Sequence, residues 1–318
     1  MLIKLPVKTT VTVLALSLFT SSVLAGSKKL IPTFPSLVLC TQRGHVIHIL
    51  QNKINWEYDG DGQAIEIQPQ PAEGRVLVAG GPRQAYLLRK VDSGLRVVWD
   101  WSGLEGVSIV SAVAADWNLK GEPSLILGAD ALGKRLILAE AKSTGVKIRW
   151  QYPLTVIPLR VRLCPDSGNF LVLLTDGSLQ EIKFQEDKLI WQWNSAQNST
   201  RVLDALREPQ GDTFVAQADG TVFSLHSDKS IGWKTTLPFQ NPARKLDQVF
   251  LTLFKKNGRR WLMVSAHDLK GPGATDILYL LDAGNGKVAN LSDHLGKEIY
   301  PPIISASPDE PSYYRKEQ

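Results

Sequence analysis

The residues of this chain that could do chemistry are few and widely separated. Five histidines occur, and none lies at a metal-ligand spacing from a cysteine or another histidine. His45 and His48 are three residues apart in an expected strand, so their side chains point to opposite faces and cannot share a metal ion. The sequence has no nucleophile elbow, phosphate-binding loop or dinucleotide fingerprint. We therefore expect no metal site and no cofactor.

One segment resembles a calcium-binding loop. Asp116 and Asn118 follow the pattern D-x-N-x-D-G, which Gly121 completes. Calcium needs oxygen ligands at alternating positions, but Lys120 places a positive charge where the third ligand should be. The segment is therefore interpreted as a turn between strands.

The longest-range pattern is a repeat of six segments, each with an apolar run, a polar turn, a second apolar run and a closing residue. In the first five copies this residue is a tryptophan, with spacings of 43, 51, 41 and 42 residues. These are Trp56, Trp99, Trp150, Trp191 and Trp233. The sixth copy has Leu291. A repeat of about 40–45 residues built from short strands is typical of a β-propeller with one four-stranded blade per copy. We expect the tryptophans to be core residues that pack against the next blade.

The predicted fold is a single all-β domain, a β-propeller of about six four-stranded blades. We assign residues 1–25 to a signal peptide, 26–308 to the propeller and 309–318 to a disordered tail. The first copy lacks the inner strand that later copies have, and residues 299–305 supply an apolar segment after the sixth. This C-terminal segment should complete the first blade and close the ring. Pro301 and Pro302 cannot donate to a ladder, so pairing should rest mainly on residues 303–305.

Cys40 and Cys164 are the two cysteines of the chain. The repeat puts them in the first and fourth blades, on opposite sides of the ring, whereas a disulfide needs Cα atoms within about 7 Å. We expect two buried thiols that are not paired.

The N-terminus has the parts of a secretory signal, with two lysines, an apolar stretch over residues 11–19 and a small-residue cleavage site ending at Ala25. The stretch is short for a bilayer span, so we expect no transmembrane segment in the mature chain and a secreted or periplasmic location. Residues 1–25 carry two lysines and no acidic residue, so the net charge of +5 becomes +3 on cleavage. This charge is not clustered and no reading motif accompanies it, which argues against nucleic-acid binding.

Three pieces of the repeat, residues 91–99, 142–150 and 282–288, resemble the blade motif of pyrroloquinoline-quinone-type propellers. That motif combines an alanine, an aspartate, a Thr-Gly-Lys turn and a tryptophan that docks onto the neighbouring blade. The matching residues of the third and sixth copies are Ala139, Thr144, Gly145, Asp282, Gly286 and Lys287. Two departures occur: Ala141 replaces the aspartate, and the tryptophan follows Gly94 and Gly145 one residue later than in the family.

The resemblance implies the propeller fold and two kinds of function. One branch is a non-catalytic scaffold, similar to the propeller lipoprotein of the outer-membrane barrel assembly machinery, whose rim loops dock other proteins. The other comprises quinoprotein dehydrogenases, which hold quinone and calcium over a central tunnel, are longer and commonly carry adjacent cysteines. This chain has no adjacent cysteines. We therefore predict an exported, monomeric propeller that is a non-catalytic scaffold and binds one or more proteins through its face loops.

The loops between the second and third strands of each copy are the candidate partner-binding surface. Their candidate residues are Arg43, Arg83, Lys134, Arg135, His267 and Lys270. Asp176 and Asp219 occupy the corresponding turns of the fourth and fifth copies, so this face should be basic on one side and acidic on the other. The longest of these loops, residues 267–276, should cover part of the channel mouth.

The alternative is a propeller enzyme, lactonase-like, lyase-like or a quinoprotein, with its site in the central channel. Such a site would take polar residues from the inner strands of several blades. The candidates are Glu66, Asp116, Arg160, Arg162, Asp204 and Asp247. The same residues could instead form a solvated channel wall.

Overall fold

The computed structural model is built almost entirely of β-strands in the part of the chain that it describes. Residues Phe34–Gln318 form one compact unit. The described residues are 36–41, 45–50, 53–59, 66–69, 75–91, 94–117, 123–142, 145–164, 167–183, 186–195, 200–208, 211–238, 246, 248–256, 258–267, 277–290 and 303–308. They confirm the prediction of an all-β fold.

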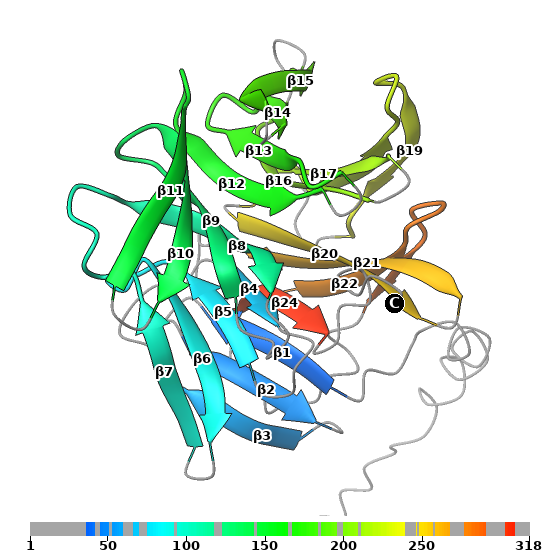
Figure 1. Cartoon of the computed structure of the whole chain (residues 1–318). Helices are drawn as coiled ribbons and strands as arrows, with labels where there is room; N and C mark the ends of the chain where they lie inside the picture. The colour runs from blue at the N-terminus through cyan, green and yellow to red at the C-terminus, as the bar shows by residue number, and fades with distance from the viewer. Residues whose placement is uncertain are drawn as a thin grey trace, which may run out of the picture. The chain divides into compact units, whose positions relative to one another are not determined.

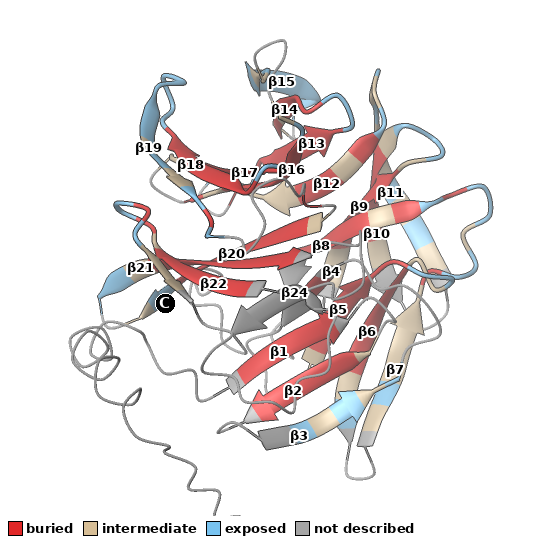
Figure 2. Cartoon of the chain, turned by 180° about the vertical axis from the view of Figure 1, so that it is seen from behind, coloured by how far each residue is buried: buried red, intermediate tan, exposed pale blue. Residues whose placement is uncertain are grey.

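Six four-stranded antiparallel sheets form the six blades of a β-propeller. From the inner to the outer strand, they are blade 1, β24 (Ile303–Pro308), β1 (Ser36–Thr41), β2 (Val46–Leu50) and β3 (Lys53–Tyr58); blade 2, β4 (Glu66–Pro69), β5 (Arg75–Ala79), β6 (Ala85–Val91) and β7 (Gly94–Asp100); blade 3, β8 (Ile109–Trp117), β9 (Pro123–Asp130), β10 (Arg135–Lys142) and β11 (Gly145–Pro153); blade 4, β12 (Pro158–Leu163), β13 (Phe170–Leu174), β14 (Leu179–Lys183) and β15 (Lys188–Trp193); blade 5, β16 (Val202–Arg207), β17 (Thr213–Gln217), β18 (Thr221–Leu225) and β19 (Ile231–Thr236); and blade 6, β20 (Gln248–Lys256), β21 (Arg259–His267), β22 (Ile277–Asp282) and β23 (Val288–Asn290). The inner strands lie toward the centre of the ring (Figure 1). Burial is greatest in the inner and middle strands, whereas outer strands such as β15 and β19 are largely exposed (Figure 2).

The ring closes through the C-terminal strand, as the sequence predicts. Strand β24 pairs antiparallel with β1, from Leu37 opposite Pro308 to Thr41 opposite Ile303. One detail of the prediction is wrong, because the pairing does not rest mainly on residues 303–305: it continues through residue 308, and residues 306–308 supply three of the five paired positions. The strand begins after the two prolines, so the ladder extends in the C-terminal direction, where the residues before Pro308 have amide groups that can donate. The predicted tail, residues 309–318, lies outside the described residues.

A β-bulge precedes the tryptophan in the outer strands of blades 1 to 4. In blade 2, Leu87 lies opposite Trp99 but Leu88 lies opposite Val97, so Val98 is an extra residue. Bulges at the same place occur in the other three blades. The bulge reverses the side-chain alternation, so Val97 packs in the cluster between blades 1 and 2 while Trp99 packs between blades 2 and 3. This extra residue accounts for the late position of the tryptophan after the turn glycine.

The five closing tryptophans pack between consecutive blades, as predicted, but each is half-buried and not part of the fully buried core. Trp150 packs in the cluster between blades 3 and 4, and Trp233 in the cluster between blades 5 and 6. Trp150 Nε1 donates to Asp187 Oδ1 at 2.5 Å, across to blade 4. Cys40 and Cys164, both buried, are not paired with each other, as expected.

Candidate functional site

Three of the six candidate channel residues come together in one buried cluster. Arg162, on β12, donates to Asp204 Oδ2 on β16 at 2.9 Å, and the Arg160 Nε lies 3.5 Å from Asp204 Oδ1. Both guanidinium groups lie over the Phe250 ring of β20, at 5.4 Å for Arg160 and 4.4 Å for Arg162. Glu66 and Asp116 are on inner strands β4 and β8, but their side chains lie outside the described part of the structure, as does Asp247.

This cluster connects the inner strands of blades 4, 5 and 6. Asp204 Oδ2 also accepts a hydrogen bond from the Leu251 amide at 2.7 Å, and Arg160 donates to the Val249 carbonyl at 3.2 Å. The Asp204 side chain is 0% exposed and the Arg162 side chain 13%. A carboxylate that is buried, ion-paired and bonded to backbone is suited to holding strands together rather than to contacting a substrate.

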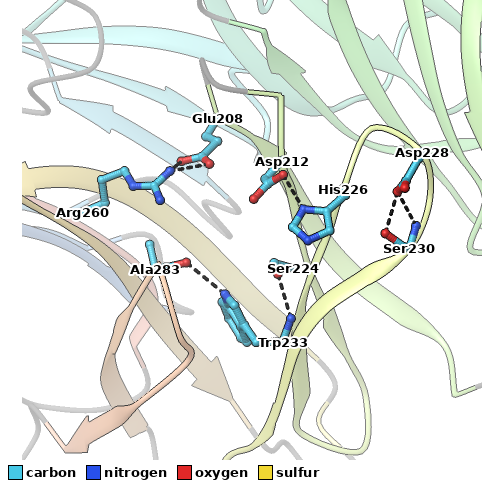
Figure 3. Close-up of polar contacts among 9 residues, drawn as sticks. All are labelled: Glu208, Asp212, Ser224, His226, Asp228, Ser230, Trp233, Arg260 and Ala283. Atoms are coloured by element: carbon cyan, nitrogen blue, oxygen red, sulfur yellow. Dashed lines mark hydrogen bonds and ion pairs between the residues drawn. The ribbon is translucent and has the colours of Figure 1, made fainter.

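The structure reveals a second polar cluster, at the ends of blades 5 and 6, that the sequence analysis did not identify (Figure 3). The Nδ1 of His226 lies 2.8 Å from Asp212 Oδ1. This hydrogen bond, with the negative charge of Asp212, raises the pKa of His226. Arg260 donates to both carboxylate oxygens of Glu208 at 2.5 Å. Burial raises the pKa of Glu208, against the opposing effect of Arg260. The sequence signal was the turn at residues 208–212, which brings two acidic residues close together.

The second cluster contains a serine, a histidine and an aspartate, but it is not a hydrolase triad. Ser224 is buried, and its Oγ accepts a hydrogen bond from the Trp233 amide at 3.1 Å. No hydrogen bond joins Ser224 to His226 among the described residues, whereas a nucleophile must contact its general base. These residues have a structural role. The Glu208–Arg260 ion pair and the hydrogen bond from Trp233 to the Ala283 carbonyl both join blade 5 to blade 6.

The candidate partner-binding loops lie on the face that we name face A, which comprises the turns between second and third strands together with the connections between blades. The two kinds of loop touch there: the Leu154 amide donates to the Lys134 carbonyl at 2.8 Å, and the Thr175 amide to the Ile157 carbonyl at 2.9 Å. The opposite face, which carries the His226 cluster, is face B.

Two of the predicted cations on face A are held by carboxylates of their own blades. Arg83 pairs with Asp100 and Arg135 with Asp130, both at 2.8 Å. Lys134 is exposed at the tip of its turn. His267 ends strand β21, but its side chain lies outside the described part, as do Arg43, Lys270 and the rest of the loop at residues 268–276.

The two predicted anions of face A cap their own turns. Asp176 Oδ1 accepts from the Ser178 amide at 2.9 Å, and Asp219 Oδ1 from the Thr221 amide at 2.9 Å. Asp176 is exposed, so its charge still faces solvent.

Face A also exposes aliphatic side chains that the sequence analysis missed. Leu132 is 67% exposed and Ile157 is 37% exposed. Leu154 and Val156 are half-buried against the core of blades 3 and 4. The available signal was a leucine inside a four-residue hairpin turn, where a polar residue is usual.

Among the residues that the structure describes, no three or more His, Cys, Asp or Glu side chains group in a way that could hold a metal ion. Nor does the described part contain a helix long and apolar enough to cross a membrane. Comparison with models of known protein families finds no match, and neither does comparison with curated proteins.

Proposed function

We propose that this chain is an exported, non-catalytic β-propeller that binds a protein partner through face A. The observation that carries the proposal is the exposure of Leu132 and Ile157 on adjoining loops of that face. Aliphatic side chains that gather on one surface of a protein commonly mark an interaction site. A propeller suits this role because its blades hold the loops in fixed positions.

The loop that carries Leu132 is held firmly in place. Asp130 and Arg135 form an ion pair across its base, and Gly133 packs so closely on this pair that a side chain there would overlap the Asp130 carboxylate. The backbone of Lys134 is fixed to Leu154 by a hydrogen bond. A preorganised loop loses little conformational entropy on binding, which favours its use as a docking element.

The two polar clusters support the proposal that the protein is not a catalyst. Asp204 and its two arginines are largely buried and paired with one another. On face B, His226 is paired with Asp212 and Glu208 with Arg260. The docking of tryptophans onto the next blade supports membership of the pyrroloquinoline-quinone-like superfamily, in its scaffold branch, which we include in the proposal.

Site-specific photo-crosslinking tests the function. A photoreactive phenylalanine analogue is placed at Leu132 or Ile157 on face A, or at two exposed control positions, Lys229 on face B and Arg96 on the outer strand β7. On irradiation of cells that produce the protein, both face A positions should give an adduct of one common mass, and the controls should not. Equal adducts at all four positions, or none at Leu132 and Ile157, would overturn the proposal.

A further inference from the structure

The aliphatic residues of face A form a strip between two turns of different blades. At one end, Leu132 and Lys134 belong to the turn between β9 and β10. The segment Leu154–Ile157 runs from a hydrogen bond with Lys134 to a hydrogen bond with Thr175, in the turn between β13 and β14. Its three residue steps span at most about 10 Å. The strip is therefore long enough for about three residues of an extended chain.

The two ends of this strip carry opposite charges. Lys134 is exposed beside Leu132, and the exposed Asp176 follows Thr175. Lys134 has a φ of 48°, which directs the backbone through a tight left-handed turn. Asp176 Oδ1 accepts hydrogen bonds from the Ser178 amide and hydroxyl, at 2.9 and 2.6 Å. The other carboxylate oxygen of Asp176 takes no part in these two bonds. A ligand on the strip thus meets a cation at one end and an anion at the other.

Building on the proposed function, we infer the chemistry of the partner segment. The partner segment is an extended chain whose aliphatic side chains contact Leu132, Leu154 and Ile157. It places an acidic residue beside Lys134 and a basic residue beside Asp176. Charge complementarity at the two ends sets the direction in which the segment lies, while the aliphatic contacts supply most of the affinity.

Three fluorescent synthetic peptides of about five residues, with three core residues between two charged ends to match the length of the strip, test this inference by fluorescence anisotropy with the purified protein. All share one core of alternating valine and threonine. The first has a glutamate at one end and a lysine at the other, the second has glutamate at both ends, and the third has lysine at both ends. The first peptide should bind most tightly. Leu132→Glu should weaken its binding more than about tenfold.

Two conservative variants test the charges. Lys134→Gln and Asp176→Asn should each weaken binding of the first peptide about two- to fivefold and reduce its salt dependence. Asp176→Asn keeps the acceptor for Ser178, so the turn should persist. Lys188→Gln, at the face B end of the outer strand β15, removes an exposed cation away from face A and should have no effect.

The outcomes separate this inference from the proposed function. Equal binding of all three peptides, no binding of any, or insensitivity to Leu132→Glu would overturn the partner chemistry. Crosslinking at Leu132 and Ile157 would still stand as evidence for the function in that case. Self-association in sedimentation experiments that Leu132→Glu abolishes would also overturn it, because the occupant would then be a second copy of the chain.

Discussion

Trp233 of blade 5 stacks on the backbone of Gly286 in the outer turn of blade 6. A Cβ at Gly286 would overlap the indole ring, and its φ of 71° also favours glycine. The indole Nε1 donates to the Ala283 carbonyl of the same turn at 2.9 Å. One ring thus provides both packing and a directed hydrogen bond between two blades (Figure 3).

The tryptophans should differ in how they tolerate phenylalanine. Trp233→Phe removes a part-buried hydrogen bond to the next blade and leaves its carbonyl acceptor, so it should cost about 1–2 kcal/mol in the free energy of unfolding beyond the packing change. Trp150→Phe removes a bond to the exposed Asp187, which water can replace, so it should cost about 0.5 kcal/mol beyond packing. Trp191 Nε1 is buried with no hydrogen-bond partner among the described residues. Trp191→Phe should therefore cost less, as measured by urea unfolding. An equal loss in all three variants would show that packing alone decides the effect.

Asp204→Asn should be among the most destabilising single substitutions in the chain. It removes the negative charge that two buried arginines share, and breaking a buried ion pair costs about 3–5 kcal/mol. Asp228→Asn, at an exposed turn where Oδ1 accepts from the Ser230 amide at 2.9 Å, is the matched control and should cost far less. The Arg162→Met and Asp204→Asn double variant should lose less than the sum of the single variants. Strict additivity would mean that the two residues are not coupled.

The His226–Asp212 pair should make stability depend on pH near neutrality. The pKa of His226 is raised above its ordinary value of 6.5 in the folded protein. The folded state therefore holds this proton more tightly, and its stabilising effect is complete below the unfolded pKa and is lost as pH rises through the folded pKa. Urea unfolding from about pH 5 to about pH 8 should show a larger decline in the wild type than in His226→Gln.

Asp212→Asn is the control for the cause of that decline, because it removes the carboxylate and leaves the histidine. It should flatten the profile as His226→Gln does. Glu208 also has a raised pKa, chiefly because of its burial, so its contribution has the same sign at lower pH. It remains in His226→Gln and is reduced in Asp212→Asn, because the charge of Asp212 also raises the pKa of Glu208. A profile unchanged by either substitution would contradict the assignment to His226.

Truncation should show whether β24 is needed for ring closure. Ending the chain after Lys297 removes β24 and leaves β1 as an unpaired edge in the middle of the ring, so the protein should aggregate. Ending it after Pro308 retains the β24–β1 ladder and should leave the melting temperature unchanged. Size-exclusion chromatography with thermal unfolding measures both. A monomeric, equally stable protein after the first truncation would disprove the closure.

The features predicted correctly follow from the number of strands in each copy of the repeat and from the position of the tryptophan within each copy. The missing inner strand of the first copy and the surplus segment at the C-terminus predicted the β24–β1 pairing. The fixed place of the tryptophans predicted that they join blades. Both follow from the requirement that each blade bury its faces and leave no open edge, which a repeat displays directly in sequence.

The features that were missed depend on contacts between residues far apart in sequence. The pairing of Arg162 with Asp204 spans 42 residues and that of Glu208 with Arg260 spans 52. The two residues of each pair lie on different blades, and no local sequence pattern shows which residues of two blades will face each other. The candidate cations Arg83 and Arg135 were identified as surface residues, but their carboxylate partners Asp100 and Asp130 depend on how each hairpin folds back. The exposure of Leu132 likewise depends on what surrounds it.

The pairing of Leu37 with Pro308 joins positions 271 residues apart. A ribosome that makes this chain therefore completes five blades before the strand that finishes the first one exists. Contacts at such long separation form slowly because the loop-closure entropy is lost first. During that interval the edge of β1 is open to pairing with other chains, so the protein depends on factors that keep nascent chains apart. The last strand to be made is thus the one that ends the exposure of this edge.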